Sequence, residues 1–131
     1  YVYSQMKYVD RPMPLVLVPL CDLVESRVGY RPNSCLLNYY VDGHSRMGFH
    51  VDSETQMLPG TGVTIVSLGG ERTLQFRRID SPSTRVSLRL QAGSLLHMPP
   101  EVQSVWQHGI RSEESDQARI SCTFRQLRVA S

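Results

Sequence analysis

Short stretches of strand-forming residues, separated at regular intervals by turn residues, constrain the fold of this chain most. From residue 35 onward the sequence contains about eight such stretches, interrupted by turn signals such as Asp-Gly and Gly-Gly. The predicted strands cover residues 35–41, 47–51, 63–68, 73–78, 85–90, 94–98, 105–110 and 118–127. This pattern is typical of an all-β sandwich or barrel. We therefore predict a mainly β fold, a double-stranded β-helix (jelly roll) with a mouth lined by inward-facing side chains.

One helix precedes these strands. Apolar side chains recur there at near-helical spacing: Leu15, Val18, Leu20, Leu23, Val24 and Val28. Pro14 near the start and Gly29 just past the end are typical helix boundaries. Because proline is tolerated only in the first turn of a helix, Pro19 favours a later start, at about residue 19. We predict an N-terminal arm and helix over residues 1–29 and a jelly-roll core over residues 30–131.

Length and composition exclude several classes of protein. A chain of 131 residues forms one domain, and a net charge of +2 does not by itself indicate nucleic-acid binding. Three widely spaced cysteines exclude a disulfide framework and a thiolate zinc site, and they fit the cytoplasm. No apolar run approaches roughly 18 residues, so we expect no membrane-spanning segment. Because the chain starts at Tyr1 rather than at methionine, we expect it to be part of a longer polypeptide. We also expect the isolated domain to be monomeric.

The motif His50-Val51-Asp52 is the first candidate for chemistry. If residues 46–52 form a strand, alternation places His50 and Asp52 on the same face, a few ångströms apart. With one further histidine, these side chains form the facial triad that holds non-haem Fe(II) and leaves positions open for a co-substrate and O₂. Zn²⁺ accepts the same ligands, and a lone His-x-Asp also occurs by chance.

Three other histidines compete to be the third ligand. His108 lies in the predicted strand 105–110, on a face with aromatic and apolar neighbours, where a buried core histidine is the alternative interpretation. His44 stands beside a turn, and His97 lies at the end of a strand, so both are weaker candidates.

The last predicted strand separates polar from apolar side chains. One face carries Arg119, Ser121, Thr123 and Arg125, and the other carries Ile120, Cys122 and Phe124. We expect the apolar face in the core between layers of the protein and the polar face toward water or a ligand. The two arginines, roughly 20 Å apart along the strand, could grip a small dicarboxylate at both ends. The polar outer face of an edge strand is the alternative.

These elements together resemble the AlkB-like Fe(II)/2-oxoglutarate dioxygenases, whose signature is Asn-x-Tyr, His-x-Asp, a distal His and Arg-x₅-Arg. In chain order this sequence has Asn38-Tyr39-Tyr40, His50-Val51-Asp52, His108, and Arg119 with Arg125. The similarity covers roughly residues 30–127, and four elements in order are a specific signal. The short length and the last strand look most like the AlkB domains within RNA-virus replication polyproteins.

The resemblance implies a site for Fe(II), 2-oxoglutarate and O₂. It implies that His50, Asp52 and His108 hold the catalytic iron. It also implies that Arg119 pairs with the distal carboxylate of 2-oxoglutarate, with Tyr40 as a hydroxyl donor there.

At the end of 2-oxoglutarate that chelates iron, the resemblance implies contacts from Arg125 and Asn38. Ser121 stands where family members often carry asparagine. The sequence therefore departs from the family pattern at one co-substrate contact, where the side chain is shorter.

The resemblance also implies the reaction and the substrate. The implied enzyme is an oxidative demethylase that hydroxylates N-methyl groups of the 1-methyladenine or 3-methylcytosine type in RNA or single-stranded DNA and releases formaldehyde. Glu54 matches an acidic position that contacts the base in the family, and Tyr1 and Tyr3 resemble an aromatic arm over a flipped base. A preference for RNA rests on the viral resemblance alone.

Phosphate contacts are predicted from the arginines around residues 79–84, namely Arg72, Arg77, Arg78, Arg85 and Arg89. For each of them, a solvated hairpin face is the alternative. Two other functions stay open. The same iron chemistry could act on a protein side chain or a small molecule, or the jelly roll could bind nucleic acid or a partner without catalysis.

Overall fold

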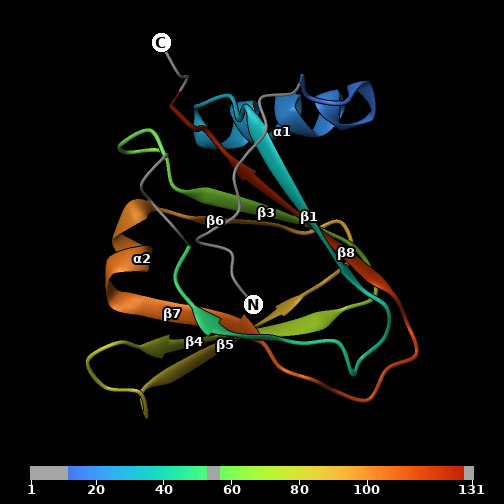
Figure 1. The fold of residues 1–131 in the computed structure, drawn as a ribbon, viewed down its shortest axis with the longest axis vertical. Coiled ribbons are helices and arrows are strands. Elements are labelled where there is room, and N and C mark those ends of the chain that lie inside the picture. Colours follow the sequence, from blue (N-terminus) through green and yellow to red (C-terminus); the bar gives the residue numbers. More distant parts are fainter. Residues whose placement is uncertain (1–11, 53–56, 129–131) are drawn as a thin grey trace.

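Two antiparallel four-stranded sheets face each other (Figure 1). The computed structural model describes residues 12–52 and 57–128. The first sheet has the order β1-β8-β3-β6 and the second the order β2-β7-β4-β5. The strands are β1 Ser34–Tyr40, β2 Met47–His50, β3 Val63–Gly69, β4 Arg72–Arg78, β5 Arg85–Leu90, β6 Leu95–Met98, β7 Trp106–Ile110 and β8 Arg119–Arg125. Because the chain passes repeatedly from one sheet to the other, the fold is the predicted jelly roll.

Each predicted strand is present, and most of the predicted bounds differ from the observed ones by one or two residues. β5 has the predicted bounds, whereas β8 ends at Arg125 rather than at residue 127. A second helix, α2 (Pro100–Val105), was not predicted and leads directly into β7. Pro100 at its start and Glu101 in its first turn are typical of a helix N-terminus, but 6 residues are too few for an apolar period to stand out.

The predicted N-terminal helix lies against the first sheet (Figure 1). A 3₁₀ turn over Leu15–Leu17 leads into α1 (Val18–Val28). Pro19 lies in the first turn of α1, where a backbone N–H would have no partner within the helix, so its absence costs no hydrogen bond. Gly29 ends the helix with φ of 86°, a left-handed conformation that favours glycine. Side chains of α1 pack with those of β3 and β8 in one cluster: Cys21, Val24, Val66, Cys122 and Phe124. No helix within the described residues has the length and hydrophobicity to cross a membrane.

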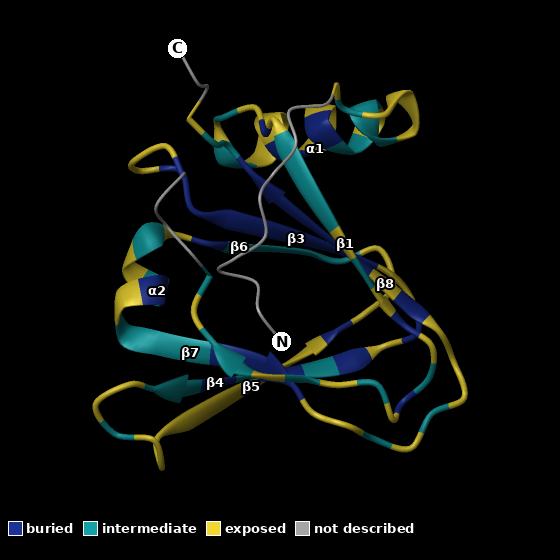
Figure 2. Cartoon of the chain, viewed as in Figure 1, coloured by how far each residue is buried: buried dark blue, intermediate teal, exposed yellow. Residues whose placement is uncertain are grey.

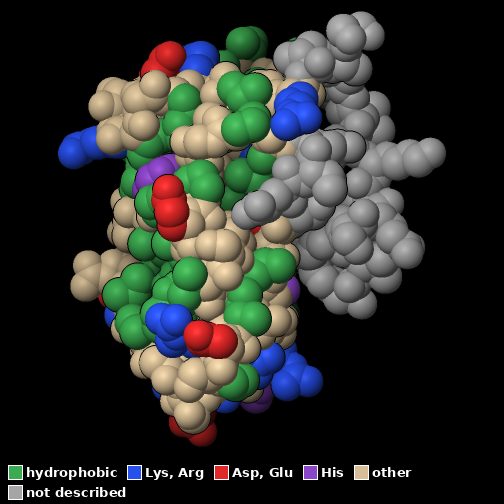
Figure 3. All heavy atoms as spheres, turned by 90° about the vertical axis from the view of Figure 1, so that its left-hand side faces the viewer, with side chains coloured by type: hydrophobic (Ala, Val, Ile, Leu, Met, Phe, Trp, Pro, Cys, Tyr) green, Lys and Arg blue, Asp and Glu red, His purple; other side chains and the backbone are tan. Residues whose placement is uncertain are grey.

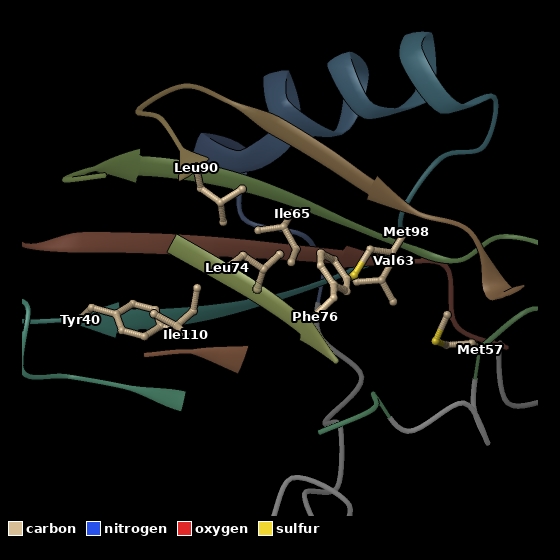
Figure 4. Packing of buried hydrophobic residues seen from close by; sticks show 9 residues of the cluster. All are labelled: Tyr40, Met57, Val63, Ile65, Leu74, Phe76, Leu90, Met98 and Ile110. Carbon is tan, nitrogen blue, oxygen red and sulfur yellow. The ribbon is translucent and has the colours of Figure 1, made fainter. Parts of the chain in front are cut away.

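Apolar side chains from both sheets form the main core (Figure 4). Its buried members are Tyr40, Met57, Val63, Ile65, Leu74, Phe76, Leu90, Met98 and Ile110. Burial differs between strands: β3 and β8 are buried along most of their length, whereas β5 is exposed except at Leu90 (Figure 2). The core therefore holds the sheets together by burying apolar surface from each of them.

β8 is a central strand, paired with β1 on one side and β3 on the other. The alternative of an edge strand with a solvated polar face is therefore wrong. Its four polar residues are only 2–6% exposed and line a pocket between the sheets. Its apolar residues Cys122 and Phe124 pack against α1. The predicted apolar face is therefore buried between the first sheet and the helix, and not between the two sheets. Ile120 lies outside that cluster and is 38% exposed.

Arg72 anchors loops at one end of the second sheet. Its side chain is 1% exposed and donates hydrogen bonds to the backbone carbonyls of Asp42, Gly43, Ser45 and Arg111. Its Nε also lies 3.4 Å from Glu113 Oε1. Because a guanidinium buried in this way does not reach a phosphate, the predicted phosphate contact is wrong for Arg72.

At the same end of the sheet, Glu113 links the loop after β7 to β4 and β5. Its carboxylate accepts hydrogen bonds from the Thr73 backbone N–H at 3.0 Å and from Arg89 Nη1 at 2.6 Å. Partial burial raises the pKa of Glu113, but the hydrogen bonds from Arg89 and Thr73 outweigh it and hold the pKa below its ordinary value. A carboxylate of this kind stabilises the fold above its unfolded pKa, and the stabilisation is lost as the pH falls through the folded pKa.

We therefore expect Glu113→Gln to lower the free energy of unfolding by about 1 kcal/mol at neutral pH. The difference from the wild type should shrink through the acid range, because the wild-type carboxylate becomes protonated there. Urea denaturation at a series of pH values measures both effects. Glu114→Gln, at the exposed neighbour, is the matched control. A loss for Glu113→Gln that does not change with pH would contradict this account.

Candidate active site

The pairing of β2 with β7 brings two histidines together. His50 and His108 are opposite each other in the register, with ring centroids 4.5 Å apart. Gly109 permits this approach, because a Cβ there would lie 2.8 Å from the Met47 carbonyl oxygen. Asp52 follows β2, and its Oδ1 lies 3.5 Å from His50 Nε2 and its Oδ2 lies 3.7 Å from His108 Nε2. The cross-strand register therefore assembles all three predicted metal ligands.

The donor set suits a divalent metal. One ligand atom from each of His50, Asp52 and His108 lies within 4.8 Å of the others. Two imidazole nitrogens and a carboxylate oxygen are typical ligands of non-haem Fe(II), and Zn²⁺ accepts them too. The competing histidines lie elsewhere, since His44 is exposed in the turn after β1 and His97 belongs to β6 of the other sheet.

Burial and charge set the protonation of these groups. Burial raises the pKa of Asp52, but a hydrogen bond from His50 and the charge of Arg125 outweigh it and lower the pKa to about 2. Burial lowers the pKa of His108 to about 4. Burial also lowers the pKa of His50, but hydrogen bonds to Asp52 and to the Gly48 carbonyl outweigh it, so this pKa is raised. At neutral pH Asp52 is therefore ionised and His108 is neutral, the forms that bind a metal.

Neighbouring groups fix how these side chains are oriented. His50 Nδ1 lies 2.8 Å from the Gly48 carbonyl oxygen, to which it donates, and Nε2 is left facing Asp52. Arg125 Nη2 lies 3.2 Å from Asp52 Oδ1. From α2, Gln103 accepts a hydrogen bond from the Asp52 backbone N–H at 3.0 Å and donates one to Asp52 Oδ2 at 3.3 Å. Gln103 was not predicted, and the adjacent prolines 99 and 100 are the main sequence signal of its helix.

One pocket between the sheets joins the metal-binding group to the predicted co-substrate residues. Its lining includes His50, Asp52, His108, Asn38, Tyr40, Arg119, Ser121 and Arg125. The structure thus brings together every residue predicted to contact the metal or the co-substrate.

Arg119 has the chemistry of a carboxylate-binding residue. It is 2% exposed, and its Nη2 donates to Ser67 Oγ at 2.9 Å. Its Nε and Nη1 are buried and find no hydrogen-bond partner among the described residues. Unsatisfied donors on a buried cation are costly, and an entering carboxylate could accept from both. This end of the pocket therefore fits one end of a dicarboxylate such as 2-oxoglutarate.

Tyr40 lies beside this guanidinium. The guanidinium carbons of Arg119 and Arg72 lie 5.1 Å and 5.4 Å from the centroid of its ring. Burial raises the pKa of Tyr40 by more than the charge of Arg119 lowers it, so the phenol stays protonated at neutral pH. Its hydroxyl can therefore donate a hydrogen bond to a carboxylate in the pocket.

The predicted substrate residues are a separate group. Glu54, Tyr1 and Tyr3 lie outside the described residues. Arg77 and Arg78 belong to β4, and neither lines the pocket.

The arginines of β4 and β5 have different surroundings. Arg77 and Arg85 flank the Phe49 ring, with guanidinium carbons 4.2 Å and 5.2 Å from its centroid. Arg78 lies over another ring, with its guanidinium carbon 5.5 Å from the Trp106 centroid, and it also forms an ion pair with Asp80 at 2.9 Å. Acidic and basic side chains are also interspersed on the face of the molecule drawn in Figure 3.

Comparisons with known proteins agree with this geometry. A family model described as the 2OG-Fe(II) oxygenase superfamily matches residues 1–129. The DNA oxidative demethylase ALKBH2 of Mus musculus is 33% identical, over 97% of this chain and 56% of that protein. The alpha-ketoglutarate-dependent dioxygenase alkB homolog 3 of Rattus norvegicus is 31% identical, over 95% of this chain and 46% of that protein. The chain thus spans about half the length of these curated relatives.

The solved structure of OsALKBH1 has the same fold, with a TM-score of 0.67 over 87% of this chain and 66% of that chain, at 17% sequence identity. The match of the family model extends over nearly the whole sequence and includes each of the pocket residues described above. The chain therefore belongs to the 2OG-Fe(II) oxygenase superfamily as an AlkB-like member, a family that uses Fe(II), 2-oxoglutarate and O₂.

Proposed function

We propose that this chain is the catalytic domain of an oxidative demethylase, which removes N-methyl groups of the 1-methyladenine and 3-methylcytosine type from nucleic acid. One observation carries the proposal. The group His50, Asp52 and His108 lines the same pocket as Arg119, which has two buried N–H groups without a partner among the described residues. The similarity to the mouse relative, a DNA oxidative demethylase, supports the substrate class.

In this proposal His50, Asp52 and His108 hold Fe(II). Bound there, the metal supplies the family's oxidative chemistry, in which O₂ converts 2-oxoglutarate to succinate and CO₂ and hydroxylates the substrate. The protein keeps Asp52 ionised and His108 neutral, so both are ready to bind a cation without first losing a proton.

Residues of β8 would hold much of the co-substrate. Arg119 would pair with its distal carboxylate, and Tyr40 would donate a hydroxyl hydrogen bond to the same group. Asn38 and Arg125 would contact the other end, and Ser121 lies between Arg119 and Arg125 on the same strand face. Because the pocket lies between the sheets, bound co-substrate is largely shielded from water.

The N-methyl group is removed in two stages. Hydroxylation gives an N-hydroxymethyl group. Its O–H then loses a proton, the C–N bond breaks, and the nitrogen keeps the electron pair of that bond, which leaves formaldehyde and the unmethylated base. The lesions are cationic, so the negative charge of Glu54 would favour them, and stacking on Tyr1 or Tyr3 would contribute about 1–3 kcal/mol per base.

We expect Arg77 to be the main contact with the nucleic-acid backbone. It lies with Arg85 around the Phe49 ring, and no ion pair with an acidic side chain is found for either arginine among the described residues. Arg78 is already paired with Asp80, so we expect a smaller contribution from it. A preference for RNA over single-stranded DNA, and an origin in a viral replication protein, stay predictions from the sequence.

The decisive experiment supplies an oligonucleotide carrying 1-methyladenine. We expect the chain, loaded anaerobically with Fe(II) and then given 2-oxoglutarate and O₂, to release succinate and formaldehyde together, well above the background with unmethylated oligonucleotide. His108→Ala should abolish both products, because the metal loses a ligand. The matched control His97→Ala changes a histidine of the other sheet and should leave both products unchanged.

Two results would contradict the proposal. Succinate that does not depend on the methyl group would indicate a protein side chain or a small molecule as the substrate. Bound oligonucleotide with no succinate under any condition would indicate a binding module or a zinc site.

The role of Arg119 gives a second prediction. Arg119→Lys keeps the positive charge but replaces the planar fork by a single ammonium, so it cannot reproduce two parallel hydrogen bonds to a carboxylate. We expect the 2-oxoglutarate concentration for half-maximal succinate release to rise by about tenfold or more. Arg27→Lys, at an exposed position of α1, is the matched control. An unchanged half-maximal concentration in Arg119→Lys would place the carboxylate elsewhere.

A further inference from the structure

Gln103 makes two contacts with a single residue of the metal-binding group. The helix α2 places its side chain, which is 4% exposed, against Asp52. Its Oε1 accepts a hydrogen bond from the Asp52 backbone N–H at 3.0 Å, and its Nε2 donates to Asp52 Oδ2 at 3.3 Å. One amide therefore holds both the backbone and the side chain of Asp52.

The chemistry of the two contacts requires an amide. The Asp52 backbone N–H only donates, so it must meet Oε1 of Gln103, and this leaves Nε2 facing the carboxylate. An ionised glutamate has no donor for the carboxylate, and a methionine of similar length has neither a strong donor nor a strong acceptor. Asparagine keeps the amide but is shorter by one methylene group. Of these side chains, glutamine alone combines the length with both hydrogen bonds.

The orientation of the Asp52 carboxylate depends on these hydrogen bonds. Rotation of a carboxylate about its last side-chain torsion has only broad preferences, so neighbouring groups decide where its oxygens point. Oδ1 lies 3.2 Å from Arg125 Nη2 and 3.5 Å from His50 Nε2. Oδ2 faces His108 Nε2 at 3.7 Å and the Gln103 donor at 3.3 Å.

Arg125 competes for the same carboxylate. Its Nη1 is buried without a hydrogen-bond partner among the described residues. A guanidinium with a spare N–H tends to bind a carboxylate through both oxygens. If Oδ2 were released by Gln103, it could turn toward Arg125 and away from His108. The donor on Gln103 opposes that rotation.

We propose that Gln103 is a positioning residue, which fixes the Asp52 carboxylate between the two histidines and thereby sets the affinity of the site for a divalent metal. The inference rests on the proposed function, because the metal site is part of it. Hydrogen-bonding neighbours of metal ligands typically change metal affinity by about 10–100-fold when they are removed. We therefore expect an effect of that size from a residue that touches no metal itself.

The test measures the dissociation constant of Co²⁺, a spectroscopic substitute for Fe(II), by titration of the purified metal-free chain. Gln103→Met removes both hydrogen bonds at similar length and should weaken Co²⁺ binding by about tenfold or more. The visible absorption bands of bound Co²⁺ should also change. Gln103→Asn, a smaller change, should weaken binding too, and it replaces the methionine variant if that protein does not fold.

Two controls separate positioning from simple loss of structure. Val102→Ala, at the neighbouring residue of α2 that packs on the core, should lower the melting temperature but leave Co²⁺ binding and its spectrum unchanged. Gln91→Met makes the same side-chain change at an exposed position and should alter neither property.

Two outcomes would overturn the inference and leave the proposed function intact. One is wild-type Co²⁺ affinity in Gln103→Met, and the other is an equal loss of affinity in Val102→Ala. If the wild type itself binds no Co²⁺, the metal site fails, and the proposed function and this inference both fall with it.

Discussion

The burial of arginine side chains is the constraint on which the rest of the structure depends. Arg72, Arg119 and Arg125 are each 5% exposed or less. Removing a charged group from water costs free energy unless the protein supplies partners. Arg72 donates to four carbonyls and so anchors loops, whereas Arg125 pairs with Asp52. Arg119 has two buried N–H groups without a hydrogen-bond partner among the described residues, more than either of the other two, which is why we propose that it binds a carboxylate.

The position of α1 explains how a sheet can turn a charged face inward. β8 carries polar residues on one face and apolar residues on the other. Because α1 covers the apolar face, the polar face is free to line the pocket between the sheets. The helix therefore contributes to the site without touching it, by giving Cys122 and Phe124 a place to pack.

The metal-binding group depends in a similar way on contacts between elements. His50 and His108 meet only through the register of β2 with β7, and Gly109 is needed for the strands to come that close. Asp52 is held from outside the sheet by Gln103 of α2. Side chains from four different elements, β2, β7, α2 and β8, thus converge on one carboxylate, which binds a cation best when it is ionised and held still.

Much of this could be predicted from the sequence, for identifiable reasons. Strand-forming stretches between turn residues reveal the eight strands, and alternation along the last of them reveals the common face of Arg119 and Arg125. Pro19 and Gly29 reveal the bounds of α1. The sequence does not reveal which strands pair, so it could not show that β8 is central. The helix α2 is too short for a periodic pattern, and Gln103 was missed with it.

In the proposed function, one pocket binds the metal and the co-substrate together. Chelation of Fe(II) by the keto acid group of 2-oxoglutarate produces a visible charge-transfer band, which neither component gives alone. We expect this band when the chain is mixed anaerobically with both, and we expect it to be absent in His50→Ala. Binding of iron and of 2-oxoglutarate with no such band would mean that they occupy separate sites, and it would contradict the account.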